Sequence, residues 1–134
     1  MKFGFFLAVL GILGILVLGT IGLLDYSVQL PNGYSLDRIY SHANLITGPP
    51  YGDIAIHANV DKYQVIGDLI LGHVTQAERS PEKELSRPGY FFIDTKTKTV
   101  IEGLNEQEWL NHIEKAGVKE KPNLKAPSRF DAIF

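Results

Sequence analysis

The chain contains no cysteine among its 134 residues. This absence excludes disulfide bonds, thiolate metal sites, a cysteine nucleophile and a lipid-bearing N-terminal cysteine. An excess of positive charge is missing as well. The chain has 13 basic and 15 acidic residues, and Lys2 is the only charged residue before Asp25, so the part beyond Leu24 carries 12 basic against 15 acidic residues. A net charge of this sign argues against a nucleic acid partner, which would require a basic face.

Known catalytic motifs are also absent: there is no Gly-x-Ser-x-Gly, no phosphate-binding glycine loop and no His-Glu-x-x-His. Four aspartates fall at predicted turns or strand ends, where Asp commonly bonds its own backbone, so we interpret them as turn residues. They are Asp53, Asp61, Asp68 and Asp94. His57 and His73 lie on predicted strands, but their spacing matches no short metal motif and solvent-facing histidines explain them equally well. We therefore expect no enzymatic activity, no metal, no cofactor and no small-molecule substrate.

Charge is missing altogether from the run between Phe3 and Leu24. A helix of this length reaches about 33 Å, against a bilayer hydrocarbon core of about 30 Å. The run is too long for the apolar region of a cleaved signal peptide, and the best cleavage site, Thr20-Ile21-Gly22, is followed by two more leucines. The sequence predicts a single uncleaved transmembrane helix over residues 3–24, within an anchor of residues 1–25 that binds the lipid bilayer.

The flanks of this segment predict its orientation. Lys2 and the α-amino group precede it, and the next basic residue is Arg38. Because basic flanks are retained in the cytoplasm, we expect a cytoplasmic N-terminus and an extracytoplasmic soluble domain.

Small residues inside the predicted helix share one face, since at 100° per residue they fall within about 80° of one another. Such a stripe lets helix backbones approach closely and pack, although glycine is also simply common in membrane helices. The predicted helix-packing residues are Gly4, Ala8, Gly11, Gly19 and Gly22.

Residues 26–117 are predicted to form one α+β domain, an antiparallel meander of four to five strands with one C-terminal helix packed on it. Residues 26–30 are expected to be a connector and residues 41–52 a loop. Alternating or hairpin patterns predict strands at 34–40, 53–60, 62–74 and 89–102, the third range being a hairpin that turns at Gly67-Asp68. In the last hairpin, Phe91 and Ile93 face one side and Tyr90 and Phe92 the other, which predicts that both faces are covered.

A helix is predicted at residues 106–116. Asn105 is its cap and Glu108 completes a capping box, Trp109 and Ile113 lie on its apolar face, and Gly117 suits the position after its end. The tail, residues 118–134, is expected to be an extended strap or disordered.

Tyrosines are dense in the first half of the soluble part. Tyr26 is interpreted as an anchor at the membrane interface, and the others either line a protein-binding surface or form half-buried edges of the core. These others are Tyr34, Tyr40, Tyr51 and Tyr63.

Several stretches together resemble a group of small bacterial envelope domains of unknown function, which are often lipoproteins. They are Leu30 to Tyr34, Val60 to Tyr63, Gly67-Asp68, Gly89 to Val100 and Glu106 to Leu110. This chain departs from that group because it has no lipid-bearing cysteine. The resemblance implies a membrane-tethered, envelope-facing sheet with a helix, and it implies no catalytic residue. The predicted location is the bacterial inner membrane, with the soluble domain periplasmic or otherwise extracytoplasmic.

These observations predict a non-enzymatic, membrane-tethered envelope protein whose soluble domain binds another protein, for example as an inhibitor or immunity factor. The alternative is an accessory subunit of a larger membrane complex, held to another membrane helix through the glycine-rich segment.

Overall fold

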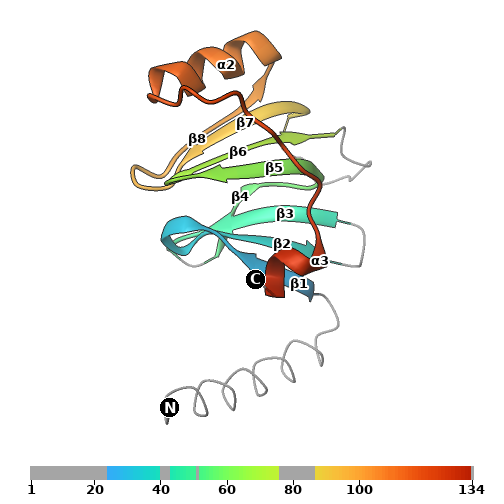
Figure 1. Ribbon diagram of the computed structural model, residues 1–134. Coiled ribbons are helices and arrows are strands. Elements are labelled where there is room, and N and C mark those ends of the chain that lie inside the picture. The colour runs from blue at the N-terminus through green and yellow to red at the C-terminus, as the bar shows by residue number, and fades with distance from the viewer. Residues whose placement is uncertain (1–23, 40–42, 51, 76–86, 134) are drawn as a thin grey trace.

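The computed structural model describes residues 24–39, 43–50, 52–75 and 87–133. Two antiparallel sheets dominate them, each a four-stranded meander (Figure 1). Sheet A contains β1 (Leu24–Gln29), β2 (Ser35–Ile39), β3 (Ala43–Gly48) and β4 (Asp53–Ile56), with the short helix η1 (Pro31–Gly33) after β1. Sheet B contains β5 (Val60–Ile66), β6 (Leu69–Val74), β7 (Gly89–Asp94) and β8 (Thr99–Leu104). Helices α2 (Glu106–Lys115) and α3 (Arg129–Ile133) follow.

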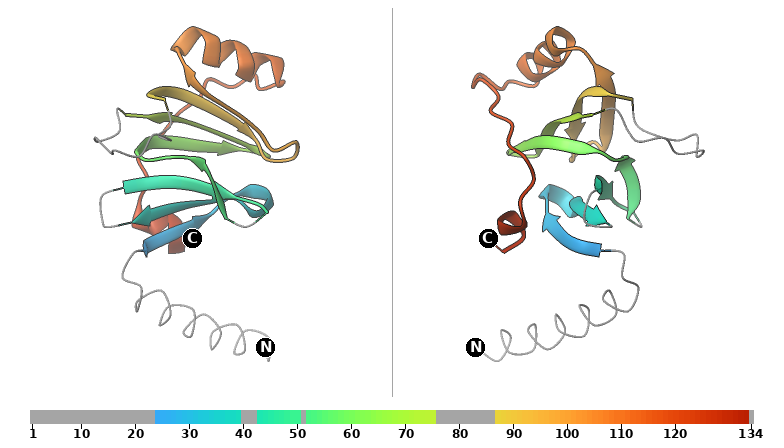
Figure 2. Two further views of the ribbon diagram at one scale, coloured as in Figure 1. Left: turned by 180° about the vertical axis from the view of Figure 1, so that it is seen from behind. Right: turned by 90° about the vertical axis from the view of Figure 1, so that its right-hand side faces the viewer.

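The architecture has three layers, because sheet B is covered on both faces: sheet A packs on one and α2 on the other (Figures 1 and 2). Strand β7 shows why. Phe91 and Ile93 enter the core between the sheets, and Phe92 packs towards Trp109 of α2. The prediction that both faces of this strand are covered is confirmed.

In the core between the two sheets, the main chain of β6 closely approaches an aromatic ring of the neighbouring strand β7. A side chain at Gly72 of β6 would collide with the ring of Phe91 on the neighbouring strand. Glycine at this position therefore makes room for the largest fully buried side chain of the core.

Helix α2 begins where the sequence predicts. The Asn105 side chain accepts a hydrogen bond from the Glu108 amide at 2.8 Å, and the Glu108 side chain accepts one from the Asn105 amide at 3.1 Å. Trp109 is only 4 % exposed. The capping box and the buried tryptophan are confirmed, and together they fix α2 on sheet B.

The predicted single meander of four to five strands is wrong, because the described residues form eight strands in two sheets. Residues 26–30, expected to be a connector, lie largely in β1, and the expected loop at 41–52 contains β3. Strand β3 escaped recognition because the side chains it directs inward include Asn44, which no apolar alternation reveals.

The predicted strand at 53–60 is also corrected. It divides at residues 57–59, so that Ile56 ends sheet A and Val60 begins sheet B, and both side chains are fully buried in the shared core. A register shift between β3 and β4 pairs Ile54 with Thr47, and Ile54 remains 46 % exposed. Full burial follows the predicted alternation only at Ile56 and Val60, and these two residues belong to different sheets.

Leu24 opens β1, so the predicted membrane helix over residues 3–24 was extended too far. Within the described ranges no helix is long and apolar enough to cross a membrane. The remainder of that predicted helix, residues 3–23, lies outside the described residues.

Beyond α2, residues 118–128 form an extended segment, here called the strap, that runs along the side of both sheets to α3 (Figures 1 and 2). The strap passes β5, and α3 rests against β1. The predicted extended tail therefore ends in a short helix, and it joins the edge of one sheet to the edge of the other.

Candidate functional site

A groove of about 570 Å³ opens where the edges of the two sheets meet α3. Most of its lining is apolar, with contributions from the end of β1 and the turn after it, from β5 and from α3. The lining residues are Val28, Gln29, Leu30, Pro31, Tyr63, Val65, Phe130 and Asp131. The site therefore depends on three segments that are far apart in the sequence.

The strap holds one wall of this groove against β5. Tyr63 and Lys125 exchange two main-chain hydrogen bonds of 2.9 and 3.0 Å, as in an antiparallel strand pair. The amide of Asn123 donates to the Gln64 side chain at 2.7 Å. Because an unpaired strand edge invites pairing with other chains, the strap protects the part of β5 that it covers.

Asp131 fastens α3 beside the groove. Its Oδ2 accepts hydrogen bonds from the Tyr63 hydroxyl at 2.9 Å and from the Ser128 amide at 3.1 Å. Burial raises the pKa of Tyr63, and the hydrogen bond and negative charge of Asp131 raise it further, with a smaller contribution from Tyr26. The phenol is thus neutral and donates to the carboxylate throughout the physiological pH range.

Past the strap, the edge of β5 is open at Val65. The two-residue turn between β5 and β6 makes Ile66 and Leu69 a hydrogen-bonded pair. Hydrogen-bonded and non-hydrogen-bonded pairs alternate along antiparallel strands, so the next pair, Val65 and Ile70, is not hydrogen-bonded. The main-chain N–H and C=O groups of Val65 therefore point away from β6. The same alternation directs Tyr63 outward, where it meets Lys125. Among the described residues, the strap makes no hydrogen bond to the main chain of Val65.

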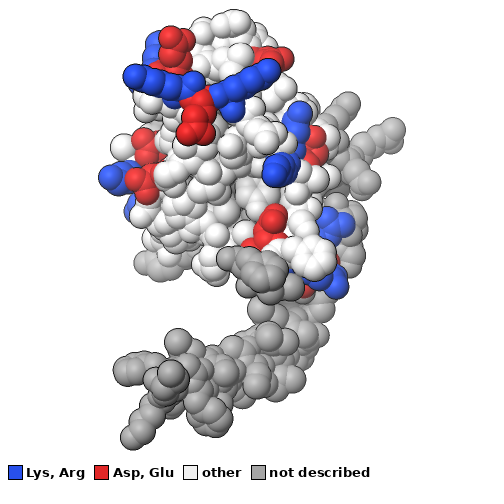
Figure 3. All heavy atoms as spheres, viewed as in Figure 1, with Lys and Arg blue, Asp and Glu red and all other residues white. Residues whose placement is uncertain are grey.

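Two large apolar side chains of the groove are exposed to solvent. Phe130 is 68 % exposed and Val65 is 39 % exposed. Figure 3 shows charged side chains around α2, at the left edge, in the right half and near the lower centre of the same view, with a broad uncharged area between these groups. The groove thus combines apolar side chains, free main-chain groups and the carboxylate of Asp131.

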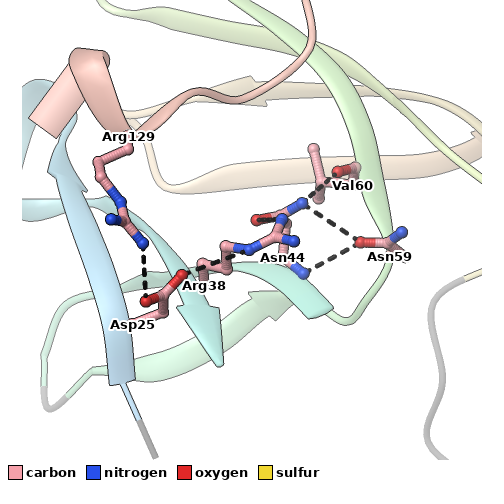
Figure 4. Close-up of polar contacts among 6 residues, drawn as sticks. All are labelled: Asp25, Arg38, Asn44, Asn59, Val60 and Arg129. Carbon is pink, nitrogen blue, oxygen red and sulfur yellow. Dashed lines mark hydrogen bonds and ion pairs between the residues drawn. The ribbon is translucent and has the colours of Figure 1, made fainter. Parts of the chain in front are cut away.

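A cluster of polar side chains lies at the start of β1 (Figure 4). Asp25 contacts Arg129 of α3 at 3.2 Å and Arg38 of β2 at 3.6 Å. Beside it, Asn44 donates its side-chain amide to the carbonyl of Val60 at 3.3 Å, and its main-chain amide donates to the side chain of Asn59 at 3.0 Å. These bonds satisfy a buried amide and connect the two sheets.

Two residues named in the sequence analysis, His73 and Asp61, lie in direct contact. His73 Nδ1 lies 2.8 Å from Asp61 Oδ1, and the ring of His73 meets the ring of Tyr90 edge-on. Asp94 accepts from the amides of Lys96 and Thr97, as expected of a turn residue. No group of three or more metal-ligating side chains forms within the described ranges.

Of the tyrosines singled out by sequence, Tyr63 lines the groove, whereas Tyr34 is only 3 % exposed and belongs to the core. Burial raises the pKa of Tyr34, with a further contribution from the charge of Asp94. Tyr26 packs against the core as a half-buried side chain, while residues 40 and 51 lie outside the described ranges.

The five predicted helix-packing residues, Gly4, Ala8, Gly11, Gly19 and Gly22, also lie outside the described residues. Sequence reasoning missed Val65 and Phe130 as site residues. The signal for both is exposure in the folded state, which a sequence does not display.

No protein-family model, curated protein or solved structure matches this chain. The resemblance to bacterial envelope domains therefore stays a prediction. The function of the groove is inferred from the residues that line it.

Proposed function

We propose that this protein is a non-enzymatic, membrane-tethered binding protein whose groove captures an extended segment of another protein. The tether is the uncharged run that precedes β1, and its basic flank at Lys2 favours an extracytoplasmic domain, consistent with a periplasmic location at a bacterial inner membrane. The groove supplies the specificity and the tether confines the encounter to the membrane surface.

The exposure of Phe130 and Val65 in one groove carries the proposal. Single exposed apolar residues are common, but two that line the same concave surface form a patch that water solvates poorly. A partner that covers both side chains gains the free energy of removing them from water.

The chemistry of the groove specifies the partner segment. The outward main-chain groups of Val65 suit an extended backbone, which adds to a sheet edge through main-chain hydrogen bonds. Both hydrogen bonds to Asp131 fall on Oδ2, so a lysine or arginine of the partner finds Oδ1 without a donor among the described residues. We expect a segment with an apolar side chain for the groove and a basic side chain beside it.

Photo-crosslinking of the full chain in its native membrane tests this function. A photoreactive side chain at Phe130 should give a defined protein adduct, and Val65→Asp should lower its yield about tenfold, because a charge replaces a buried valine contact. Val100→Asp is the matched control, since Val100 is a valine of an edge strand, β8, with a similar exposure of 37 %.

The expected result is an adduct whose yield falls about tenfold in Val65→Asp and stays unchanged in Val100→Asp. An adduct insensitive to both substitutions, or no adduct at Phe130, contradicts binding in the groove.

A further inference from the structure

Within the described residues, the strap pairs with β5 at one position, although its register predicts two. Tyr63 and Lys125 exchange both of their main-chain hydrogen bonds, so they form a hydrogen-bonded antiparallel pair. Such pairs recur at every second residue, which makes Val65 and Asn123 the next one expected. The amide of Asn123 donates to the side chain of Gln64 at 2.7 Å instead.

Gln64 holds the strap towards one face of sheet B. Gln64 pairs with Leu71, which belongs to the cluster under α2, so the Gln64 side chain lies on the face that α2 covers. Val65 is the next residue of the strand and faces the opposite side, where its partner Ile70 enters the core between the sheets. The strap runs from the end of α2 past β5 (Figures 1 and 2), and Gln64 contacts it on the side from which it comes.

This contact leaves space beside the edge of β5. A hollow of about 500 Å³ is lined by both Val65 and Asn123. It shares Tyr63, Val65 and Asp131 with the groove, so the two spaces meet at the open end of β5. The main-chain groups of Val65 therefore stay free while Asn123 is bound to Gln64.

We propose that Gln64 is a positioning residue that keeps the partner-binding edge of β5 open, and that the strap is an internal competitor for this edge. In the open state Asn123 bonds to Gln64. In the closed state Asn123 leaves Gln64 and forms the second pair with Val65, which occupies the main-chain groups that a partner strand requires. The proposal rests on the groove of the proposed function and adds a means of regulating it.

The two states exclude each other because the amide of Asn123 has a single hydrogen to donate. A partner strand that pairs with Val65 therefore selects the open state, and its affinity falls with the fraction of molecules whose strap is closed. Removing the acceptor of Gln64 should favour the closed state about fivefold, the change expected for the loss of one hydrogen bond.

Disulfide trapping measures the closed state in the full chain in detergent, because the chain has no cysteine of its own. Val65→Cys and Asn123→Cys place two thiols at opposing positions of the closed pair, where a Cα separation of about 5.5 Å suits a disulfide. The rate of crosslinking is then proportional to the closed population.

Two variants of Gln64 in this double-cysteine chain form a matched pair. Gln64→Met retains an unbranched side chain of similar length without the carbonyl acceptor, and should raise the crosslinking rate about fivefold. Gln64→Glu retains an acceptor for the amide of Asn123 and should leave the rate unchanged. Equal rates for Gln64→Met and the chain with Gln64 would overturn the proposal. A rate that both variants raise equally would overturn it too, because the acceptor would then not be what holds the strap.

The photoreactive side chain at Phe130 tests whether closure blocks the groove. Forming the disulfide between positions 65 and 123 in the native membrane should lower the adduct yield about tenfold, because open molecules are removed, and reductant should restore it. An adduct that persists with the disulfide formed would overturn the proposal and leave the proposed function intact. No adduct from the chain without cysteines would reject the proposed function and, with it, the strap as a competitor, whatever the crosslinking rate.

Discussion

Replacing Trp109 tests the layer in which α2 covers sheet B. Its indole Nε1 donates a 2.9 Å hydrogen bond to the carbonyl of Phe91, and its ring stacks on Tyr90 at a centroid distance of 4.5 Å. Phe91 lies where the register of β7 and β8 shifts, between Tyr90 and Phe92. The indole therefore adds a buried hydrogen bond to the main chain of β7 as well as filling the core.

These contacts predict losses of stability of different size for two substitutions of Trp109. Trp109→Ala removes the ring, the stacking and the hydrogen bond, and should cost about 3 to 5 kcal/mol. Trp109→Phe keeps an aromatic ring against Tyr90 but loses the hydrogen bond from the indole to the carbonyl of Phe91, which costs about 0.5 to 1.5 kcal/mol.

Urea unfolding of the full chain in detergent, followed by the near-ultraviolet circular dichroism of its tyrosines, measures both variants. The unfolding midpoint should fall for Trp109→Phe and fall further for Trp109→Ala. Two variants that both unfold at the midpoint of the unmodified chain would refute the packing of α2 on sheet B.

Three further predictions concern the cap, the groove and the uncharged run. Asn105→Ala should destabilise the fold by about 0.5 to 2 kcal/mol in the same urea assay, because the Glu108 amide loses its acceptor. The pKa of Tyr63 is raised above its ordinary value of 10.0, so its stabilising effect is complete below pH 10 and is lost as the pH rises further. Urea midpoints at pH 9 and 11 should differ less for Tyr63→Phe than for the unmodified chain. If the stripe packs against a partner helix, Gly11→Ile should lower the yield of crosslinks made within the membrane, whereas equal yields for Gly11→Ile and Leu13→Ile would leave the stripe without a packing role.

Local signals in the sequence predicted local structure well. The hairpin at Gly67-Asp68 forms, with a positive φ of 59° at Gly67, and the capping box at Asn105 and Glu108 forms in full. Each depends on residues only a few positions apart, whose turn or cap geometry their own chemistry determines.

The division into two sheets was not predicted because it depends on contacts between residues that are far apart in the sequence. Asn44 occupies an inward position of β3, and the partners that satisfy its amide, Asn59 and Val60, lie in another part of the chain. The uncharged run was extended into β1 for a related reason, since Leu24 is apolar in either setting. Hydropathy does not distinguish a membrane helix from the first residue of a strand.

The same distinction between local signals and tertiary contacts applies to the groove. Tyr63 was a candidate site residue because tyrosines are dense in that part of the sequence. Its role in the groove, however, depends on Lys125 and Asp131, which lie more than 60 residues later in the chain and which the strap places beside it. Exposure of Phe130 follows from that return, so only the folded chain reveals it.

Hydrogen exchange at one amide tests the central claim most directly. The segment captured by the photoreactive side chain at Phe130 is synthesised as a peptide and added to the full chain. The amide of Val65 should exchange more slowly when the peptide is bound, because its outward hydrogen gains an acceptor, whereas the amide of Tyr63 already donates to Lys125 and should change little. An exchange rate at Val65 that does not change with saturating peptide would contradict binding of a partner strand in the groove.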